Sequence, residues 1–202
     1  MIEGILSRHK PVSDQMEADE LRIILGELRS VIDGEVYGSV VEFGCYVGTT
    51  SLFIRRLLDA ADKTRDFQVY DSFAGLPAKT REDESPAGQH FEAGQLSASP
   101  SQLITNFKKA GLAKPIIHKS WFDDLTDEDL PDAIAFALLD GDFYQSIKTS
   151  LKLAGPRLTI GGKLIIDDYQ SEALPGVKRA VDEWLRQHPM RLRVQSSLAI
   201  LG

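Results

Sequence analysis

Apolar and polar positions along this chain repeat with two different periods. Leu21, Leu25 and Leu28 belong to an i, i+3, i+4 stripe that predicts an amphipathic helix over residues 17–33. Beyond it, short apolar runs typical of strands alternate with further helical patterns. We expect strands at 39–44, 67–72, 115–122, 133–140 and 163–168, helices at 49–61, 100–110, 144–154 and 175–187, and one or two final strands within 191–201. This alternation predicts βαβ units and an α/β fold with a doubly wound, mostly parallel sheet.

Capping residues place the ends of two of these helices. Asp14 and Glu17 have the spacing of a capping box before the first helix, and the residues ahead of them show no clear period. Ser99 supplies an N-cap, Pro100 a first helical residue, and Gly111 a C-cap for the helix at 100–110. These residues predict an irregular start to the chain and a short, well-delimited helix in its middle.

One polar stretch interrupts the alternation. Residues 78–98 are rich in glycine and charge and show no period, so we expect a long loop that acts as a lid. The charged run at 81–84 (REDE) is predicted to face solvent. We interpret residues 1–202 as a single domain, with 1–38 as an amino-terminal helical extension.

Composition narrows the class of protein. A chain of 202 residues that is 43% hydrophobic is long enough to bury a sizeable core. The formal charge of −7 argues against a nucleic-acid partner, and no apolar run approaches membrane-spanning length. No secretory signal is recognisable and the chain has one cysteine, so a cytoplasmic location is expected.

The turn after the first predicted strand, VEFGCYVGTTS, carries the first candidate chemistry. Gly44 and Gly48 permit a tight turn and a close approach of the backbone to a ligand, next to the unpaired N–H groups of a helix. Glu42 precedes the first glycine, and Cys45 and Tyr46 interrupt the G-x-G-x-x-G pattern of dinucleotide sites. The E-x-G-x-x-x-G pattern instead resembles the first motif of class I methyltransferases that use S-adenosylmethionine (SAM).

An acidic residue at the end of the second strand extends this site. Asp71 stands where Rossmann-type folds place the carboxylate that accepts hydrogen bonds from ribose hydroxyls. Together, the glycine turn and Asp71 predict a nucleoside site.

Two further strands end in paired carboxylates. Asp140 and Asp142 follow the fourth strand, and Asp167 and Asp168 follow the fifth. If these strands are neighbours, four carboxylates meet beside the nucleoside site and repel one another unless a cation such as Mg²⁺ binds them. One member of a pair could bind the metal while the other accepts a proton. A preference of strand-end turns for Asp would explain one such residue more easily than two pairs.

The order and spacing of five segments resemble the macrocin O-methyltransferase (TylF-type) family, over about residues 39–187. The segments are VEFGCYVGTTS, YDSFAGLP, KSWFDDLT, LLDGDFYQS and GGKLIIDDYQ. Members of this family are metal-dependent class I methyltransferases that act on sugar hydroxyls of antibiotics. The resemblance therefore implies SAM and Mg²⁺ as cofactors, a small-molecule acceptor with a sugar hydroxyl, and a possible homodimer.

The resemblance also implies roles for particular residues. Mg²⁺ would be held by Asp140, Asp167 and Asp168, and Asp142 would be the general base. Residues expected near the cofactor are Glu42, Gly44 and Gly48 at its methionine end, Asp71 at the ribose, Ser72, Ser120, Trp121, Phe122 and Asp123 near the adenine, and Asp140.

Three alternatives remain open from the sequence. A catechol-type methyltransferase would share the fold and the metal, but we expect an Asp-Asn pair where this chain has Asp167 and Asp168. A nucleotide-dependent oxidoreductase is disfavoured by the missing third glycine. A non-catalytic SAM binder is the third possibility.

Overall fold

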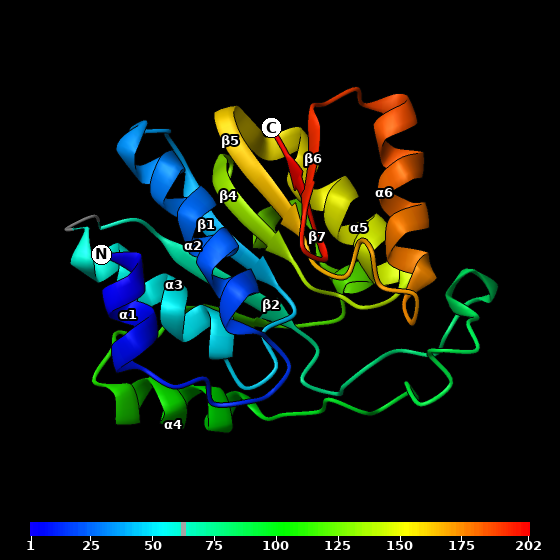
Figure 1. Ribbon diagram of the computed structural model, residues 1–202, viewed down its shortest axis with the longest axis horizontal. Helices are drawn as coiled ribbons and strands as arrows, with labels where there is room; N and C mark the ends of the chain where they lie inside the picture. The colour runs from blue at the N-terminus through cyan, green and yellow to red at the C-terminus, as the bar shows by residue number, and fades with distance from the viewer. Residues whose placement is uncertain (62–63) are drawn as a thin grey trace.

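The computed structural model describes residues 1–61 and 64–202, and its centre is one seven-stranded sheet (Figure 1). The strands are β1 (Ser39–Phe43), β2 (Phe67–Asp71), β3 (Ile116–Lys119), β4 (Ile134–Leu139), β5 (Leu158–Ile166), β6 (Leu192–Gln195) and β7 (Leu198–Leu201). Their spatial order is β3-β2-β1-β4-β5-β7-β6. The first five strands run parallel, and β7 pairs antiparallel with both β5 and β6. The predicted doubly wound, mostly parallel sheet is confirmed.

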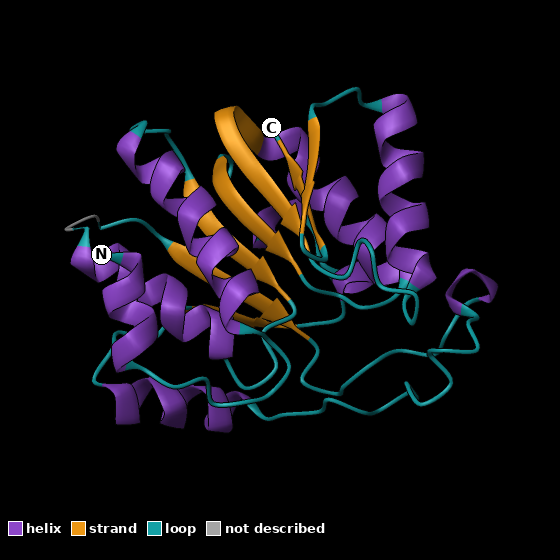
Figure 2. Ribbon diagram, viewed as in Figure 1, coloured by secondary structure: helices purple, strands orange, loops and turns teal. Residues whose placement is uncertain are grey.

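Helices cover both faces of this sheet (Figure 2). They are α1 (Ile2–Arg8), α2 (Ala18–Asp33), α3 (Thr49–Ala60), α4 (Pro100–Ala110), α5 (Tyr144–Ala154) and α6 (Pro175–Gln187). The first four share one hydrophobic core with Val40 of β1, and α5 and α6 share a second core with Val41. Successive strand residues point to opposite faces, so one short apolar run supplies both cores.

The order of the strands reverses between β1 and β4, and this position determines where a ligand can bind. Every residue of β4 is buried, since β1 and β5 flank it and helices cover both faces. In open α/β sheets the crevice outside the carboxyl ends of the strands at such a reversal is the usual ligand site. The glycine turn follows β1, and the first aspartate pair follows β4.

The amino-terminal region differs from the prediction. Residues 2–8 form α1, which the sequence pattern did not reveal because seven residues are too few to establish a helical period. Helix α2 begins one turn later than the predicted capping box requires. Its N-cap is Glu17, whose backbone N–H donates to the carboxylate of Glu20 at 3.2 Å. Asp14 is therefore not part of the capping box.

Two strands have other bounds than predicted. β3 ends at Lys119. Ser120 N–H donates the last hydrogen bond to β2, to the Asp71 carbonyl at 3.0 Å, and the chain then turns into a 3₁₀ helix at Phe122–Asp124. β5 begins at Leu158, five residues early, with an irregular register that the positive φ of Gly161 accompanies. The early start of β5 arises because pairing with β4 overrides the local pattern, whereas β3 is shorter because its pairing with β2 ends.

The long segment 78–98 contains a 3₁₀ turn, Arg81–Asp83. Asp83 is completely buried, so the prediction that the 81–84 run faces solvent is wrong at this residue. Among the helices in the described part of the chain, none combines the length and apolarity that a membrane crossing requires.

Candidate functional site

A cavity of about 780 Å³ opens at the carboxyl ends of the parallel strands. Its walls come from the turn after β1, the ends of β2, β4 and β5, the 3₁₀ turn after β3, the 72–96 segment and the residues just before α2. The predicted site residues on its lining are Gly44, Asp71, Ser72, Trp121, Phe122, Asp123, Asp140, Asp142, Asp167 and Asp168. Glu42, Gly48 and Ser120 lie outside this lining.

The two glycines of the first turn are required by backbone geometry. Gly44 has a φ of +86°, and a Cβ built on it would lie 1.9 Å from the carbonyl oxygen of Asp140. Gly48 has a φ of +89° at the N-cap of α3, where a Cβ would lie 2.3 Å from Leu103 Cδ1. Only glycine allows both the conformation and the contact. The turn is thereby held directly against the end of β4.

Asp71, at the end of β2, connects this turn to β2 by hydrogen bonds. One carboxylate oxygen accepts the backbone N–H groups of Cys45 and Tyr46, each at 2.9 Å. The other accepts the N–H of Phe73 at 2.6 Å. These bonds orient the carboxylate at the cavity wall, and its predicted contact with a ribose stays a prediction.

Glu42 is a buried structural neighbour of the cavity. Its carboxyl group accepts a hydrogen bond from the hydroxyl of Ser51 on α3. Burial raises the pKa of Glu42 to about 8, an effect that the Ser51 hydrogen bond opposes and the charge of Asp71 reinforces. Glu42 therefore carries a proton near neutral pH and joins β1 to α3 behind the turn.

The segment predicted near the adenine forms one end of the cavity. Trp121 is 41% exposed there, and Phe122 packs edge-on against Phe43 with ring centroids 5.4 Å apart. Asp123 accepts hydrogen bonds from Gln145 at 3.3 Å and from Thr149, both on α5. An exposed indole beside a packed phenyl ring offers a flat apolar face to a planar ring system.

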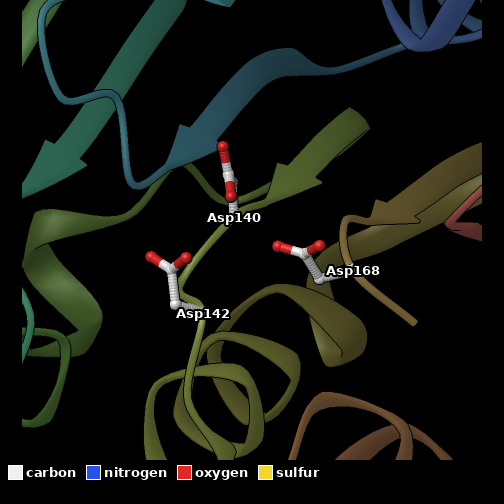
Figure 3. A group of neighbouring side chains, drawn as sticks. All are labelled: Asp140, Asp142 and Asp168. Atoms are coloured by element: carbon white, nitrogen blue, oxygen red, sulfur yellow. The ribbon is translucent and has the colours of Figure 1, made fainter. Parts of the chain in front are cut away.

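Three aspartates meet where β4 and β5 end (Figure 3). Asp140, Asp142 and Asp168 each offer a carboxylate oxygen, and these oxygens all lie within 4.8 Å of one another. Asp142 and Asp168 both adopt φ +58°, a left-handed conformation that Asp tolerates better than most residues. Because β4 and β5 are hydrogen-bonded neighbours, Asp168 of the second pair joins both aspartates of the first, whereas all four were predicted to meet.

Asp167 lies beside this group but not within it. One of its oxygens accepts the backbone N–H of Asp168 at 2.8 Å and the hydroxyl of Ser197 at 3.3 Å. The single proton of the Ser197 hydroxyl is shared with Glu20, whose carboxylate lies closer, at 2.6 Å. The geometry thus groups Asp142, and not Asp167, with Asp140 and Asp168, and the role of Asp167 as a metal ligand stays a prediction.

Residues near the amino terminus form a wall of the cavity that the sequence did not indicate. Asp14, Glu17 and Glu20 line it, although the local pattern suggested only a helix start. Ser13 holds this segment in place, because its N–H and hydroxyl contact Thr49 Oγ1 of α3 at 3.1 and 2.7 Å. This long-range contact places the segment next to the cavity, and no local pattern in the sequence indicates such a contact.

The aspartates at the ends of β4 and β5, of which Asp167 is buried and the others half-buried, have strongly raised pKa values. Burial, followed by the charges of neighbouring carboxylates, raises the pKa of Asp142, Asp167 and Asp168 from 3.8 to about 7. The pKa of Asp140 is raised well above its ordinary value, with Asp167 as the largest charge contribution after burial. Without a cation, the group is therefore largely protonated below neutral pH.

We expect the stability of the metal-free protein to fall as pH rises from 5 to 8. An aspartate whose pKa is raised on folding holds its proton more tightly in the folded state, so its stabilising contribution at low pH is lost as pH rises toward about 7. A loss of only 1 kcal/mol lowers the melting temperature of a chain this size by about 2–4 °C. Thermal unfolding in EDTA across this range measures the effect, and added Mg²⁺ should reverse it at pH 8. A melting temperature that is constant or rises with pH would contradict the expectation.

The sequence matches the macrocin-O-methyltransferase (TylF) family over residues 18–196. The chain is 34% identical over 152 residues to the 8-demethyl-8-(2,3-dimethoxy-alpha-L-rhamnosyl)-tetracenomycin-C 4'-O-methyltransferase of Streptomyces olivaceus, a match that covers 72% of this chain and 58% of that protein. It is 33% identical over 169 residues to the mycinamicin III 3''-O-methyltransferase of Micromonospora griseorubida, covering 80% of this chain and 65% of that protein. The chain thus spans about three fifths of the length of these curated relatives.

Solved structures share the same fold. The O-methyltransferase NovP superposes with a TM-score of 0.81 and 26% identity, over all of this chain and 88% of that chain. The calicheamicin methyltransferase CalS11 superposes with a TM-score of 0.75 at 18% identity, over 99% of this chain and 89% of that chain, which shows likeness of fold. With the match over residues 18–196, these findings lead to one conclusion: the chain belongs to the macrocin O-methyltransferase (TylF) family.

Proposed function

We propose that this protein transfers the methyl group of SAM to a hydroxyl group of a sugar carried by a natural product, with Mg²⁺ as a second cofactor. The observation that supports this proposal best is the convergence of Asp140, Asp142 and Asp168 within 4.8 Å, next to the glycine turn after β1. The named activities of the relatives, which methylate a rhamnosyl-tetracenomycin and mycinamicin III, favour a glycosylated acceptor. Family membership argues against the oxidoreductase alternative.

The residues present are suited to one divalent cation. Oxygen ligands of Mg²⁺ stand about 2.1 Å from the ion, so opposite ligands lie about 4.2 Å apart. Carboxylate oxygens of Asp140 and Asp168 lie within 4.8 Å of each other, so both can reach one ion, with Asp142 beside them. Three half-buried carboxylates with raised pKa values would also gain from a positive charge between them. Asp140 and Asp168, with Asp167 beside them, are the proposed ligands. A bound Mg²⁺ would supply a positive charge that lowers the pKa of an acceptor hydroxyl.

Asp142 is the proposed general base. Methylation of a hydroxyl oxygen requires that its proton leaves, and the carboxylate of Asp142 faces the same space as those of Asp140 and Asp168. A pKa of about 7 is well matched to accepting a proton near neutral pH. The glycine turn and Asp71 would position the cofactor, and the exposed face of Trp121 would lie against its adenine.

We expect S-adenosylhomocysteine to bind in EDTA and methyl transfer to require added Mg²⁺. In the proposed arrangement, the turn after β1 and Asp71 bind the cofactor, and the three aspartates serve the acceptor; all of them line the same cavity except parts of the turn. Calorimetry with S-adenosylhomocysteine in EDTA should give saturable binding in the micromolar range. Mycinamicin III and demethyldecarbamoylnovobiocin, the latter named for a relative in Streptomyces niveus, are suitable first acceptors with Mg²⁺ present.

The two measurements separate the parts of the proposal. If S-adenosylhomocysteine fails to bind the folded protein, the cofactor assignment is wrong. If full methyl transfer persists in EDTA, the cofactor assignment stands and the metal site is wrong.

A further inference from the structure

The segment after β2 is attached to the start of α5 by one buried aspartate. Asp83 is completely buried in the 3₁₀ turn Arg81–Asp83, which lies beside the amino-terminal end of α6, at the right of Figure 1. One of its carboxylate oxygens accepts the backbone N–H of Tyr144, the first residue of α5, at 2.7 Å. The other accepts the N–H and the hydroxyl of Thr80 at 2.9 and 2.7 Å. Three donors thus converge on a single buried carboxylate.

The surrounding backbone leaves room for this carboxylate and little else. A Cβ built on Gly176, near the start of α6, would lie 1.9 Å from the Asp83 oxygen that contacts Tyr144. Further along the segment, Ser85 donates to the carbonyl of Glu172 at 2.6 Å. Asp83 therefore sits where the 80–88 segment, α5 and α6 meet.

This junction connects two parts of the cavity. Thr80, Phe91 and Leu96 of the segment line one wall, and Asp142 stands two residues before the N–H that Asp83 accepts. Asp142 itself has a left-handed backbone in a short turn, in which Phe143 N–H donates to the Gly141 carbonyl at 2.6 Å. The hydrogen bond that Tyr144 N–H donates to Asp83, which lies outside this turn, restrains the turn.

We propose that Asp83 is a positioning residue, which holds Asp142 and the wall formed by residues 78–96 in a fixed relation to each other. This inference rests on the proposed function, in which Asp142 accepts a proton from the acceptor. Displacement of a reacting group by about 1 Å can cost about 100-fold in rate. Loss of the Asp83 contact should therefore lower kcat strongly and leave the affinity for the cofactor nearly unchanged.

The chain contains a matched control. Thr126 and Asp129 form the same Thr-x-x-Asp capping box, in which one Asp129 oxygen accepts the N–H and the hydroxyl of Thr126, both at 2.8 Å. This second box lies in the 3₁₀ turn Asp127–Asp129, and neither residue lines the cavity. Asp129→Asn therefore reproduces the chemical change of Asp83→Asn away from the proposed site.

The test compares the two variants by proteolysis and by steady-state kinetics. Asparagine has one carbonyl oxygen, so Asp83→Asn can satisfy Tyr144 or Thr80 but not both. We expect tryptic cleavage at Lys79 or Arg81 to accelerate about tenfold or more and kcat to fall about 10- to 100-fold. The Kd for S-adenosylhomocysteine should stay within about twofold of the wild-type value. Asp129→Asn should leave cleavage and kcat near wild type.

Thr80→Val provides a second variant if Asp83→Asn does not fold. It removes one hydroxyl donor and leaves the Tyr144 contact, so a smaller loss of kcat in the same direction is expected. The positioning role is wrong if kcat stays within twofold in the Asp83 and Thr80 variants, or if Asp129→Asn lowers kcat equally. A wild-type protein without methyl transfer would refute the proposed function instead, and the proteolysis comparison would still test the attachment.

Discussion

Replacing Asp142 with asparagine is expected to lower methyl transfer by about 10²- to 10⁴-fold while S-adenosylhomocysteine binding persists. The amide keeps the size of the side chain but cannot accept a proton at neutral pH. A carboxylate oxygen of Asp142 lies within 4.8 Å of those of Asp140 and Asp168, and Asp142 is not part of the glycine turn after β1, so its loss should affect the chemical step and leave that turn intact. Steady-state turnover and calorimetric titration of the same preparation provide the measurement.

Asp124 supplies the control for this substitution. It also lines the cavity, but its side chain is exposed and lies outside the group of three aspartates. Asp124→Asn makes the same change of charge at the cavity, and turnover should remain within a few-fold of wild type. If Asp142→Asn stays active, Asp142 is not the base. If both variants lose activity equally, the loss is caused by the change of charge in the cavity and not by removal of a base.

Replacing Gly44 with alanine is expected to destabilise the fold by about 2–4 kcal/mol and to weaken S-adenosylhomocysteine binding more than tenfold. The new Cβ would lie 1.9 Å from the Asp140 carbonyl oxygen, and the residue would have to keep a φ of +86°. Relief of this contact must move the turn away from β4, and the N–H groups of Cys45 and Tyr46 move with it. Chemical denaturation and calorimetry measure the two consequences.

Gly26 is the matched control for this change. It lies within α2, and a Cβ built there would meet nothing within 4 Å. Gly26→Ala should stabilise the protein by about 0.5–1 kcal/mol, because alanine loses less conformational freedom in a helix. A Gly44→Ala protein that matches wild type in stability and cofactor affinity would show that the close approach to Asp140 is not required.

Much of the fold could be predicted because its signals are local. The apolar run of β4 indicates a strand covered on both faces, and Ser99, Pro100 and Gly111 delimit α4 through hydrogen bonds and backbone angles within a few residues. The conformation of the glycine turn is also local, since Gly44 and Gly48 both adopt positive φ, although their close contacts with Asp140 and Leu103 are not. Such features depend on the chain within one turn of each residue, so a sequence pattern carries them.

Other features depend on contacts between distant segments, and the sequence pattern either missed them or indicated a different environment. Helix α1 carries Ile2, Ile5 and Leu6 at helical spacing, but its seven residues are too few for a period to be recognised. Asp83 reads as part of a solvated run, yet it is buried against Tyr144, 61 positions away. Ser197 reaches Glu20 across 177 positions. In each case the burial that decides the role of the residue is supplied by another element.

The sequence by itself determined the doubly wound sheet, the glycine turn and the aspartate pair at the end of each of two strands, because these signals are local. That β4 and β5 are neighbours, so that their carboxyl ends meet, is a result of the tertiary structure. Which three carboxylates face one another was decided by the tertiary structure alone. The left-handed backbone of Asp142 and Asp168 and the hydrogen bond from Ser197 to Asp167 turn individual side chains toward or away from the shared space. Side-chain direction at the end of a strand is set by such contacts, because the alternation that orients residues within the strand no longer applies there.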